Sequence, residues 1–527
     1  MSDIFSASCK AALKPLQPGS MFFLWAFIGL TITLILLSRR SRTRKLLPPG
    51  PPGLPLLGNL FQFPRTHLWL RLTEWRDQYG PIFSVNMAGQ TIVVLNTFEL
   101  VTDLFDRRSS IYSDRPRLVM ASEILAGGFL LPAMAYGERW RRMRRVAHET
   151  FNVHASERFR PMQEREAALL VANILQEPKR WSYYCKRNAA SVALTSVFLR
   201  PLTDSSADHI INRMDEISRS LTEASIIGTY LVDVFPIMLY LPEWLARWKR
   251  EGREHHEAYT AMFERLMSDL RQKLQSGQFE DCLGASSLEA EDRGDLSKKE
   301  SAWLAGVMFL AGADTSAGAL HVLLLAMTLY PNALRRAHEE LDTVIGRDRL
   351  PCFQDQKDLP YIDAIVKELL RWRPIAPIGA PRRCTQDNWY KGYLIPKGAI
   401  VIQNTWGMSH DTAYFPDADE FRPERFLETN GQAADFVPTT NTQKNFAFGS
   451  GRRICVGMNL AYQSLFINTA CMLWALNVQK ALDKNGMPIF PSRTEIIDEG
   501  LAVFPAPFEC VLVPRLSGIS QTISHIK

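Results

Sequence analysis

The stretch that decides the fold is Phe448-Gly-Ser-Gly-Arg-Arg-Ile-Cys-Val-Gly457, which is followed by an apolar run with helical spacing, Met458 to Val478. Glycines here let the backbone approach a flat group closely, and Cys455 stands at the start of the expected helix. Unpaired N–H groups and the positive dipole at a helix start favour a thiolate, which is the metal-binding form of cysteine. Cys455 is therefore predicted to be a metal ligand.

Two other interpretations of this stretch are possible. Gly449-x-Gly451 could open a dinucleotide site, but the third glycine of that motif is missing and no strand-helix-strand unit surrounds it. Cys455 could instead be an inert buried cysteine, but that interpretation leaves the neighbouring glycines and arginines unexplained.

The overall composition is that of an ordinary globular protein. The chain has 527 residues, 46% of them hydrophobic and 22% charged, which excludes a disordered or fibrous chain. The formal net charge of +6 is local, because five of the 61 basic residues are Arg39, Arg40, Arg42, Arg44 and Lys45. The other 56 nearly balance the 55 acidic residues, so a nucleic-acid-binding surface is not expected.

An uncharged apolar run, Met21 to Leu37, precedes these basic residues. It is at the short end of the length needed for a membrane-spanning helix. A cleavable signal peptide is the competing interpretation, but it would carry its basic residues before the apolar run. We expect a short lumenal tail at 1–20 and a single transmembrane anchor at 21–38. The positive-inside rule then places the residues from Arg39 onward on the cytoplasmic side of the membrane, which we expect to be that of the endoplasmic reticulum.

Residues 39–55 are expected to form a basic flank and a stiff hinge, because the prolines of Leu47-Pro-Pro-Gly-Pro-Pro-Gly-Leu-Pro55 fix φ. A proline-rich ligand for another domain is the alternative. Residues 56–527 are expected to form one domain, mainly α with smaller β-sheets (α+β). The patterns predict strands within Ile82 to Leu95, Tyr393 to Asn404 and Leu501 to Pro514, and an exposed connection at Gly277 to Ser301.

The longest expected helix, Trp303 to Tyr330, is apolar except in its middle, Ala311-Gly-Ala-Asp-Thr-Ser316. Glycine inside a helix costs about 1 kcal/mol relative to alanine, and an acid in an apolar run costs more unless it has a partner. Asp314 and Thr315 are therefore functional or are satisfied locally. In the local case Thr315 would bond the carbonyl four residues back and Asp314 would form a salt bridge.

These features resemble the cytochrome P-450 family. Its haem-binding signature, Phe-x-x-Gly-x-Arg-x-Cys-x-Gly, is met at every position from Phe448 to Gly457. The resemblance implies the cytochrome P-450 fold and a haem b whose iron Cys455 ligates, with Phe448 and Gly449 beside the cofactor. A thiolate ligand donates electron density to haem iron and so favours O–O cleavage.

The resemblance also implies roles for residues outside this stretch. Asp314 and Thr315 would deliver protons at the distal face of the haem. Glu368 and Arg371, in the expected helix Tyr361 to Trp372, would form a buried structural network with Arg425. By itself an i,i+3 pair such as Glu368 and Arg371 is common on helix surfaces.

Haem carries two propionates, so cationic and N–H donors should converge on them. The resemblance points to Trp140, Arg144, Arg382 and Arg453, and it leaves Arg383 as a rival to Arg382. Trp140 and Arg144 lie in an expected helix within Tyr136 to Arg145, and its other arginines, Arg139, Arg141, Arg142 and Arg145, form either a solvated face or a docking surface for an acidic redox partner. NADPH-cytochrome P-450 reductase is the implied electron donor, because the chain has no flavin or nicotinamide module.

The sequence is most similar overall to fungal secondary-metabolism members of the family. The implied activity is insertion of one oxygen atom from O2 into a lipophilic terpenoid, polyketide or indole intermediate. Substrate contacts are expected from four largely apolar stretches, Met120 to Ala135, Leu221 to Leu241, Pro374 to Pro381 and Glu499 to Phe508. A reductase-independent haem-thiolate isomerase and a non-catalytic haem sensor are the alternatives, and neither needs the Asp314–Thr315 pair.

Overall fold

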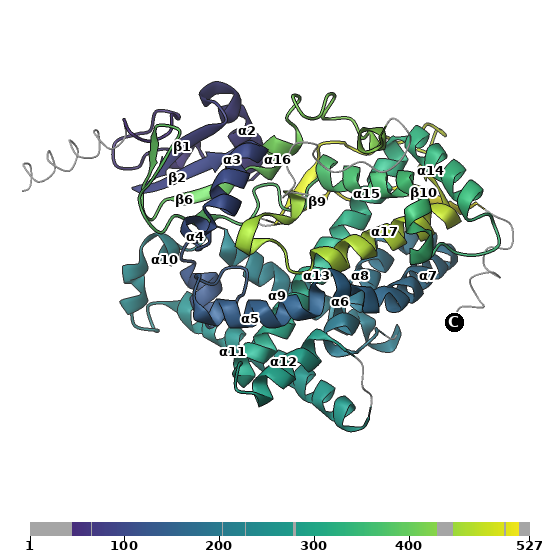
Figure 1. The fold of residues 1–527 in the computed structure, drawn as a ribbon, viewed down its shortest axis with the longest axis horizontal. Coiled ribbons are helices and arrows are strands. Elements are labelled where there is room, and N and C mark those ends of the chain that lie inside the picture. Colours follow the sequence, from purple (N-terminus) through teal and green to yellow (C-terminus); the bar gives the residue numbers. More distant parts are fainter. Residues whose placement is uncertain are drawn as a thin grey trace, which may run out of the picture.

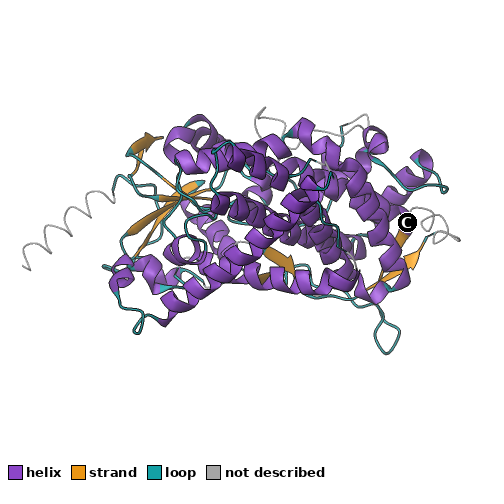
Figure 2. Cartoon of the chain, turned by 90° about the horizontal axis from the view of Figure 1, so that it is seen from below, coloured by secondary structure: helices purple, strands orange, loops and turns teal. Residues whose placement is uncertain are grey.

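The computed structural model describes residues 45–64, 66–202, 204–226, 228–277, 281–428, 446–499 and 502–515. Helices form most of the body, and strands gather mainly towards its two ends (Figures 1 and 2). The anchor predicted at 21–38 lies outside the described residues. Within the described part, one helix, Lys298–Leu329, has the length and hydropathy to cross a membrane, and most of it is buried inside the body.

The α-helices of the described residues are α2 (Leu68–Tyr79), α3 (Phe98–Val101), α4 (Ser109–Tyr112), α5 (Glu138–Phe151), α6 (Val153–Ser156), α7 (Arg160–Gln176), α8 (Trp181–Phe198), α9 (Asp204–Ser225), α10 (Leu231–Val234), α11 (Arg247–Gln275), α12 (Leu283–Asp292), α13 (Lys298–Leu329), α14 (Pro331–Val344), α15 (Pro360–Trp372), α16 (Thr405–Ser409) and α17 (Met458–Ala475). The strands are β1 (Ile82–Met87), β2 (Gln90–Leu95), β3 (Arg382–Arg383), β4 (Asn388–Tyr390), β5 (Tyr393–Ile395), β6 (Ile400–Gln403), β7 (Leu476–Lys480), β8 (Ile496–Asp498), β9 (Val503–Pro505) and β10 (Cys510–Pro514). The predicted mixture of many helices and small sheets is confirmed.

The largest sheet has the strand order β1-β2-β6-β3. β1 and β2 are antiparallel, with Ile82 opposite Leu95, and β2 runs parallel to β6. Ala88 and Gly89 make the tight turn between β1 and β2 with φ of 47° and 102°. The strand pair predicted between Ile82 and Leu95 is therefore confirmed, as are strands in the two later stretches.

The proline-rich hinge is non-helical, as predicted, and it is docked on the first strand. The carbonyl oxygens of Pro48 and Pro49 accept hydrogen bonds from the hydroxyl and the N–H of Ser84, at 2.6 and 2.7 Å. Gly50 lies so close to this strand that a Cβ there would be 1.9 Å from the Ser84 carbonyl oxygen. The start of the described chain is thus held against the sheet rather than standing off as a spacer.

The exposed connection predicted at Gly277 to Ser301 is wrong in its middle. Residues 283–292 form α12, whose Leu283 and Leu288 are buried against α5, α8, α11 and α13. Two leucines among polar residues give little periodic signal, and the helix forms because its neighbours cover them. The connection to α13 is therefore short, and Ser297 and Glu300 close it with a capping box.

Helix α13 lies at the centre of the body and packs along α8, α11 and α17 (Figure 1). Its residues enter both of the large hydrophobic clusters of the protein. The loop that carries Cys455 leads directly into α17, so the packing of α17 beside α13 places this loop relative to the middle of α13.

Candidate active site

The Cys455 loop is shaped by its glycines. Gly451 has φ of 55°, and a Cβ there would be 2.0 Å from the carbonyl oxygen of Phe105, so no larger residue fits. Gly449 also has a positive φ, of 76°. The N–H of Cys455 donates to the carbonyl of Phe448 at 2.9 Å. These contacts fix the position of Cys455 just before the first turn of α17.

Cys455 combines an exposed side chain with densely packed surroundings. Its side chain is accessible to solvent, yet burial dominates its surroundings and raises the pKa of the thiol. Both observations hold if protein surrounds the sulfur but leaves a hollow in front of it. The N–H of Gly457 and the guanidinium of Arg144 oppose the rise in pKa and favour the thiolate.

Thr315 is also exposed within a helix that is otherwise deeply buried. It shares this exposure with Ala311, one turn earlier on the same face of α13. The Thr315 hydroxyl donates to the Ala311 carbonyl at 2.7 Å. This is the hydrogen bond to the carbonyl four residues back that the sequence analysis named as one of two possibilities. Its oxygen therefore keeps its lone pairs for a hydrogen-bond donor in the space that it faces.

Asp314 points about 100° around the helix from Thr315. Its carboxylate accepts a hydrogen bond from the Ser218 hydroxyl of α9. The pKa of Asp314 is raised to about 6, mainly by burial and in part by nearby Asp215, although Ser218 and Lys186 act to lower it. Lys186 pairs with Asp215 at 3.0 Å, and among the described residues no cation forms a salt bridge with Asp314.

The Asp314 side chain lines a cavity of about 390 Å³ between α8, α9, α13 and β9. Exposed Lys179, Lys186, Arg219 and Glu499 also line it, so the cavity opens to the surface. Asp314 can therefore exchange protons with water, while Thr315 is exposed on the neighbouring side of the helix.

Arg453 is buried beside Trp140, with its guanidinium 4.2 Å from the centre of the indole ring. It donates to the carbonyls of Ser113 and Met134, both at 2.7 Å. Its Nη1 is buried, and no atom of the described residues accepts a hydrogen bond from it. Burial lowers the pKa of Arg453 to about 9, which indicates a cation in need of an anion.

The structure separates Arg382 from Arg383. The two residues form β3, where successive side chains point to opposite faces. Arg383 pairs with Asp114 at 2.8 Å, whereas Arg382 is buried, donates to the Ser450 carbonyl and lies 3.8 Å from the centre of the Phe105 ring. This geometry favours Arg382 as the cation available to a buried anion.

A fourth arginine, Arg115, was missed by the sequence reasoning. It is buried and donates to the carbonyls of Pro132, Ala380 and Pro381, and burial lowers its pKa to about 10. Its charge also lowers the pKa of Arg382 and of Arg453. No local pattern distinguishes it from the exposed Arg117 two residues later, so only the fold reveals it.

Arg115, Arg144, Arg382 and Arg453 thus converge near the Cys455 loop. Burial lowers the pKa of each, and mutual repulsion lowers the pKa of Arg382 and Arg453 further. Such a group of cations is costly without a buried anion. The two propionates of a haem whose iron lies at the Cys455 sulfur would supply that anion, and Arg453 Nη1 is a donor ready for one.

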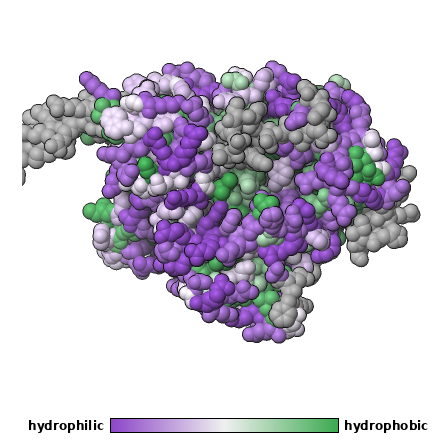
Figure 3. All heavy atoms as spheres, in the orientation of Figure 1, coloured by the Kyte–Doolittle hydropathy of each residue, from purple (hydrophilic) through white to green (hydrophobic). Residues whose placement is uncertain are grey.

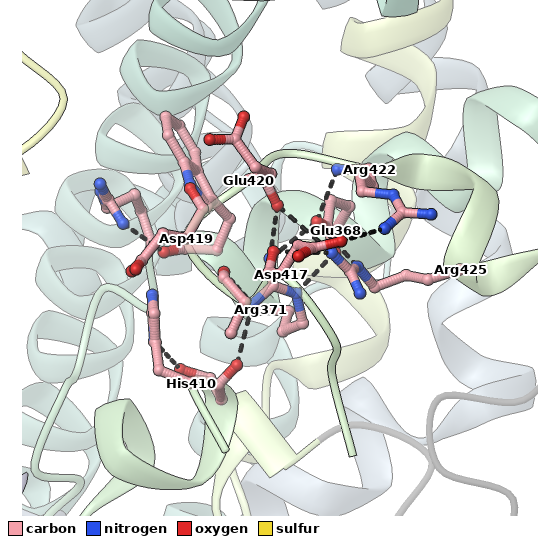
Figure 4. Close-up of polar contacts among 12 residues, drawn as sticks. Glu368, Arg371, His410, Asp417, Asp419, Glu420, Arg422 and Arg425 are labelled. Carbon is pink, nitrogen blue, oxygen red and sulfur yellow. Dashed lines mark hydrogen bonds and ion pairs between the residues drawn. The ribbon is translucent and has the colours of Figure 1, made fainter. Parts of the chain in front are cut away.

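The predicted network of Glu368, Arg371 and Arg425 is confirmed (Figure 4). Arg371 binds Glu368 through two contacts of 2.7 Å, and neither side chain is exposed. Arg425 adds a contact of 3.1 Å, and the N–H of Arg422 one of 2.8 Å. The network joins α15 to the segment 417–425 with every carboxylate oxygen used.

Comparisons with known proteins agree with this geometry. The family description "Cytochrome P450" matches residues 48–497. The chain is 47% identical to Cytochrome P450 monooxygenase 253 of Postia placenta over 99% of both chains. It is 36% identical to Tryptamine 4-monooxygenase of Psilocybe cyanescens over 92% of this chain and 96% of that one. The chain therefore belongs to the cytochrome P450 family and is a haem-thiolate monooxygenase.

Proposed function

We propose that this enzyme inserts one oxygen atom from O2 into a lipophilic intermediate of secondary metabolism, with electrons from NADPH through a separate reductase. The observation that carries the proposal is the convergence of Arg115, Arg144, Arg382 and Arg453 near the Cys455 loop, which leads into the helix that packs beside α13 and its exposed Thr315. A haem with a thiolate ligand supplies oxygen activation when it is bound there.

We assign the haem contacts as follows. Cys455 ligates the iron, and Phe448 and Gly449 present the loop beside the ring. Trp140 stacks on Arg453 and so fixes the guanidinium near the cofactor. The proposed donors to the haem propionates are Trp140, Arg115, Arg144, Arg382 and Arg453.

In this proposal, Asp314 and Thr315 deliver protons to the oxidation site. With a pKa of about 6, the Asp314 carboxyl is mostly ionised at neutral pH, but it keeps its proton far more often than an ordinary aspartate, so it can both take and release a proton. It reloads from water in the cavity that it lines. The Thr315 hydroxyl donates to the Ala311 carbonyl, so its oxygen is free to accept a hydrogen bond from, and thereby orient, the last donor in the path.

The substrate class rests on the lining stretches and on the relatives. The four stretches expected to contact substrate are largely apolar, which favours a lipophilic molecule. One relative is named for its action on tryptamine, an indole, and we propose an indole, terpenoid or polyketide intermediate for this enzyme.

The outer face of α5 is the proposed docking surface for NADPH-cytochrome P450 reductase. Arg139 and Arg141 are about half exposed, and Arg145 is exposed beside them. The inner face of the same helix carries Trp140 and Arg144, which lie next to the Cys455 loop. An acidic partner on this surface would therefore approach the haem by a short route.

We also propose attachment to the endoplasmic reticulum membrane. Apart from the anchor expected at 21–38, exposed apolar side chains follow α10, among them Ile237, Tyr240 and Trp244, which are 75%, 89% and 79% exposed. Figure 3 shows hydrophobic atoms at the edge of the molecule where Figure 1 places α10. Such a surface suits the interface of a bilayer.

The test is the spectrum of the reduced carbonyl complex, followed by turnover. Wild-type protein should show the red-shifted Soret band of a thiolate-ligated haem, and Cys455→Ala should abolish it; an unchanged band would refute the assignment of Cys455. Oxidation of a lipophilic substrate should require both NADPH and reductase. Product formation without NADPH would favour the isomerase, and haem binding without any turnover would favour the sensor.

A further inference from the structure

Two differently exposed faces lie side by side along α13. Thr315 and Ala311 are exposed but do not line the charged cavity, whereas Asp314 and His321 line it, and the cavity opens to the surface. Water in that cavity would disturb chemistry at the Thr315 face if it moved freely between the two. A barrier between the cavity and the Thr315 face would have to lie where these two faces of α13 adjoin.

Gly318 occupies that boundary. With about 100° per residue, Gly318 lies about 60° from Thr315, on the same side as Asp314, and His321 lies about 120° away. Gly318 itself lines the cavity, and of the α13 residues that do so it lies nearest in angle to Thr315, so it marks the edge of the cavity towards the Thr315 face. A barrier in this place has to rest on the backbone of Gly318.

The side chain that rests there is Phe504 of β9. A Cβ built at Gly318 would be 2.7 Å from one carbon of the Phe504 ring and 3.2 Å from Ile375 Cδ1. Phe504 lines the cavity, whereas Ile375 is absent from the cavity lining within the described residues. The ring therefore meets the helix with the cavity on one side and Ile375 on the other.

The backbone holds Phe504 in this position. The N–H of Val503 donates to the Ile375 carbonyl at 2.9 Å, and β9 pairs with β8 so that Phe504 is opposite Ile497. Glycine at 318 is what allows the close approach, because any side chain would displace the ring by at least 0.7 Å to restore a contact of 3.4 Å.

We propose that Phe504, seated on Gly318, is the wall that separates the charged, water-accessible cavity from the oxidation site. The proposal rests on the function proposed above, because it takes the Thr315 face as the place of oxidation. Phe504 is a positioning residue: with the wall in place, protons from the cavity pass through the Asp314 carboxyl, and bulk water stays out.

The test compares two phenylalanines that line the same cavity. Phe504→Ala removes the wall, whereas Phe508→Ala removes an identical ring that packs on Trp181, 5.1 Å between ring centroids. Both variants enlarge the cavity by the same side chain, but only the first connects it to the Thr315 face. The spectrum of the reduced carbonyl complex checks that each variant is folded and loaded with haem.

The first readout needs neither substrate nor reductase. Ferric haem iron relaxes the protons of exchanging water, so the water-proton relaxivity of the resting protein reports water access to the oxidation site. Phe504→Ala should at least double this relaxivity, and Phe508→Ala should leave it at the wild-type value. Equal relaxivities in the two variants, or no change in either variant, would refute the proposal that Phe504 separates the cavity from the oxidation site.

Gly318→Ala provides a second route to the same answer. It should raise the relaxivity in the direction of Phe504→Ala, and it should add nothing in the Phe504→Ala background, because both changes act on one wall. Additive effects would show that Gly318 does not act through Phe504. Failure of the proposed function would appear separately, as wild-type protein that shows no turnover with reductase and NADPH.

Discussion

Replacing Glu368 by glutamine should destabilise the protein strongly although the two side chains have nearly the same shape. Glu368 and Arg371 are fully buried, and Arg425 is 9% exposed. Glutamine would keep one acceptor oxygen, but it would leave the guanidinium groups of Arg371 and Arg425 without a counter-charge and would place an NH2 donor where the second carboxylate oxygen accepted. Breaking a buried ion pair in this way costs about 3–5 kcal/mol.

This cost is large compared with the whole stability of a folded protein, about 5–15 kcal/mol. It lowers the folding equilibrium constant by roughly a hundredfold to a few thousandfold. The assay is urea-induced unfolding followed by tryptophan fluorescence, together with the half-life of the red-shifted Soret band of the reduced carbonyl complex. Both the free energy of unfolding and the half-life should fall.

The protein contains a matched control in the pair Glu420 and Arg493. This pair also has two contacts, of 2.8 and 3.1 Å, but its side chains are 43% and 46% exposed. Glu420→Gln should therefore cost only about 0–1 kcal/mol. The reasoning is refuted if Glu368→Gln loses less than about 1 kcal/mol, or if the two variants lose the same amount.

Four further outcomes are expected. Thr315→Ala should keep its haem but release more peroxide per NADPH consumed, because the last proton donor is no longer oriented. Because burial raises the pKa of Asp314 from 3.8 to about 6, the native state keeps a proton that the unfolded chain releases. Stability should therefore fall as the pH rises through the range 4 to 6, and thermal unfolding of Asp314→Asn should lack this loss. Charge reversal at Arg139 and Arg141 should slow electron transfer from reductase, most strongly at low salt, in stopped-flow measurements. Deletion of residues 1–45 should release most of the protein from lipid vesicles in a flotation assay.

Matched variants sharpen these outcomes. Thr315→Ser keeps the hydroxyl and should release as little peroxide per NADPH consumed as the wild type. If it releases as much peroxide as Thr315→Ala, the Thr315 hydroxyl has no role in proton delivery. Charge reversal at Arg335, an exposed arginine of α14, should not affect reductase. Any vesicle binding that remains after the deletion should disappear when Ile237 and Trp244 are also changed to serine. If the binding persists in that variant, the exposed apolar residues after α10 are not a second site of membrane attachment.

Local patterns were sufficient for the elements whose signal lies within a few neighbouring residues. The strand pair at 82–95 follows from alternation around Ala88 and Gly89, and both residues adopt the positive φ that the turn needs. The start of α17 and the signature around Cys455 follow equally from the order of residues. Helix α12 was missed because Leu283 and Leu288 become informative only when other helices cover them.

The sequence by itself determined the family, the cysteine loop and the long helix with Asp314 and Thr315, because spacing along one chain encodes a helix start, a tight turn or a signature. Apart from the network of Glu368, Arg371 and Arg425, the tertiary structure alone decided which charges meet. It buried Arg115 and Arg382 among other arginines, paired Arg383 with Asp114, and brought Asp314, but not Thr315, to the lining of the cavity. These outcomes depend on side chains that approach from distant segments, such as Phe504 against Gly318, and no local pattern records such an approach.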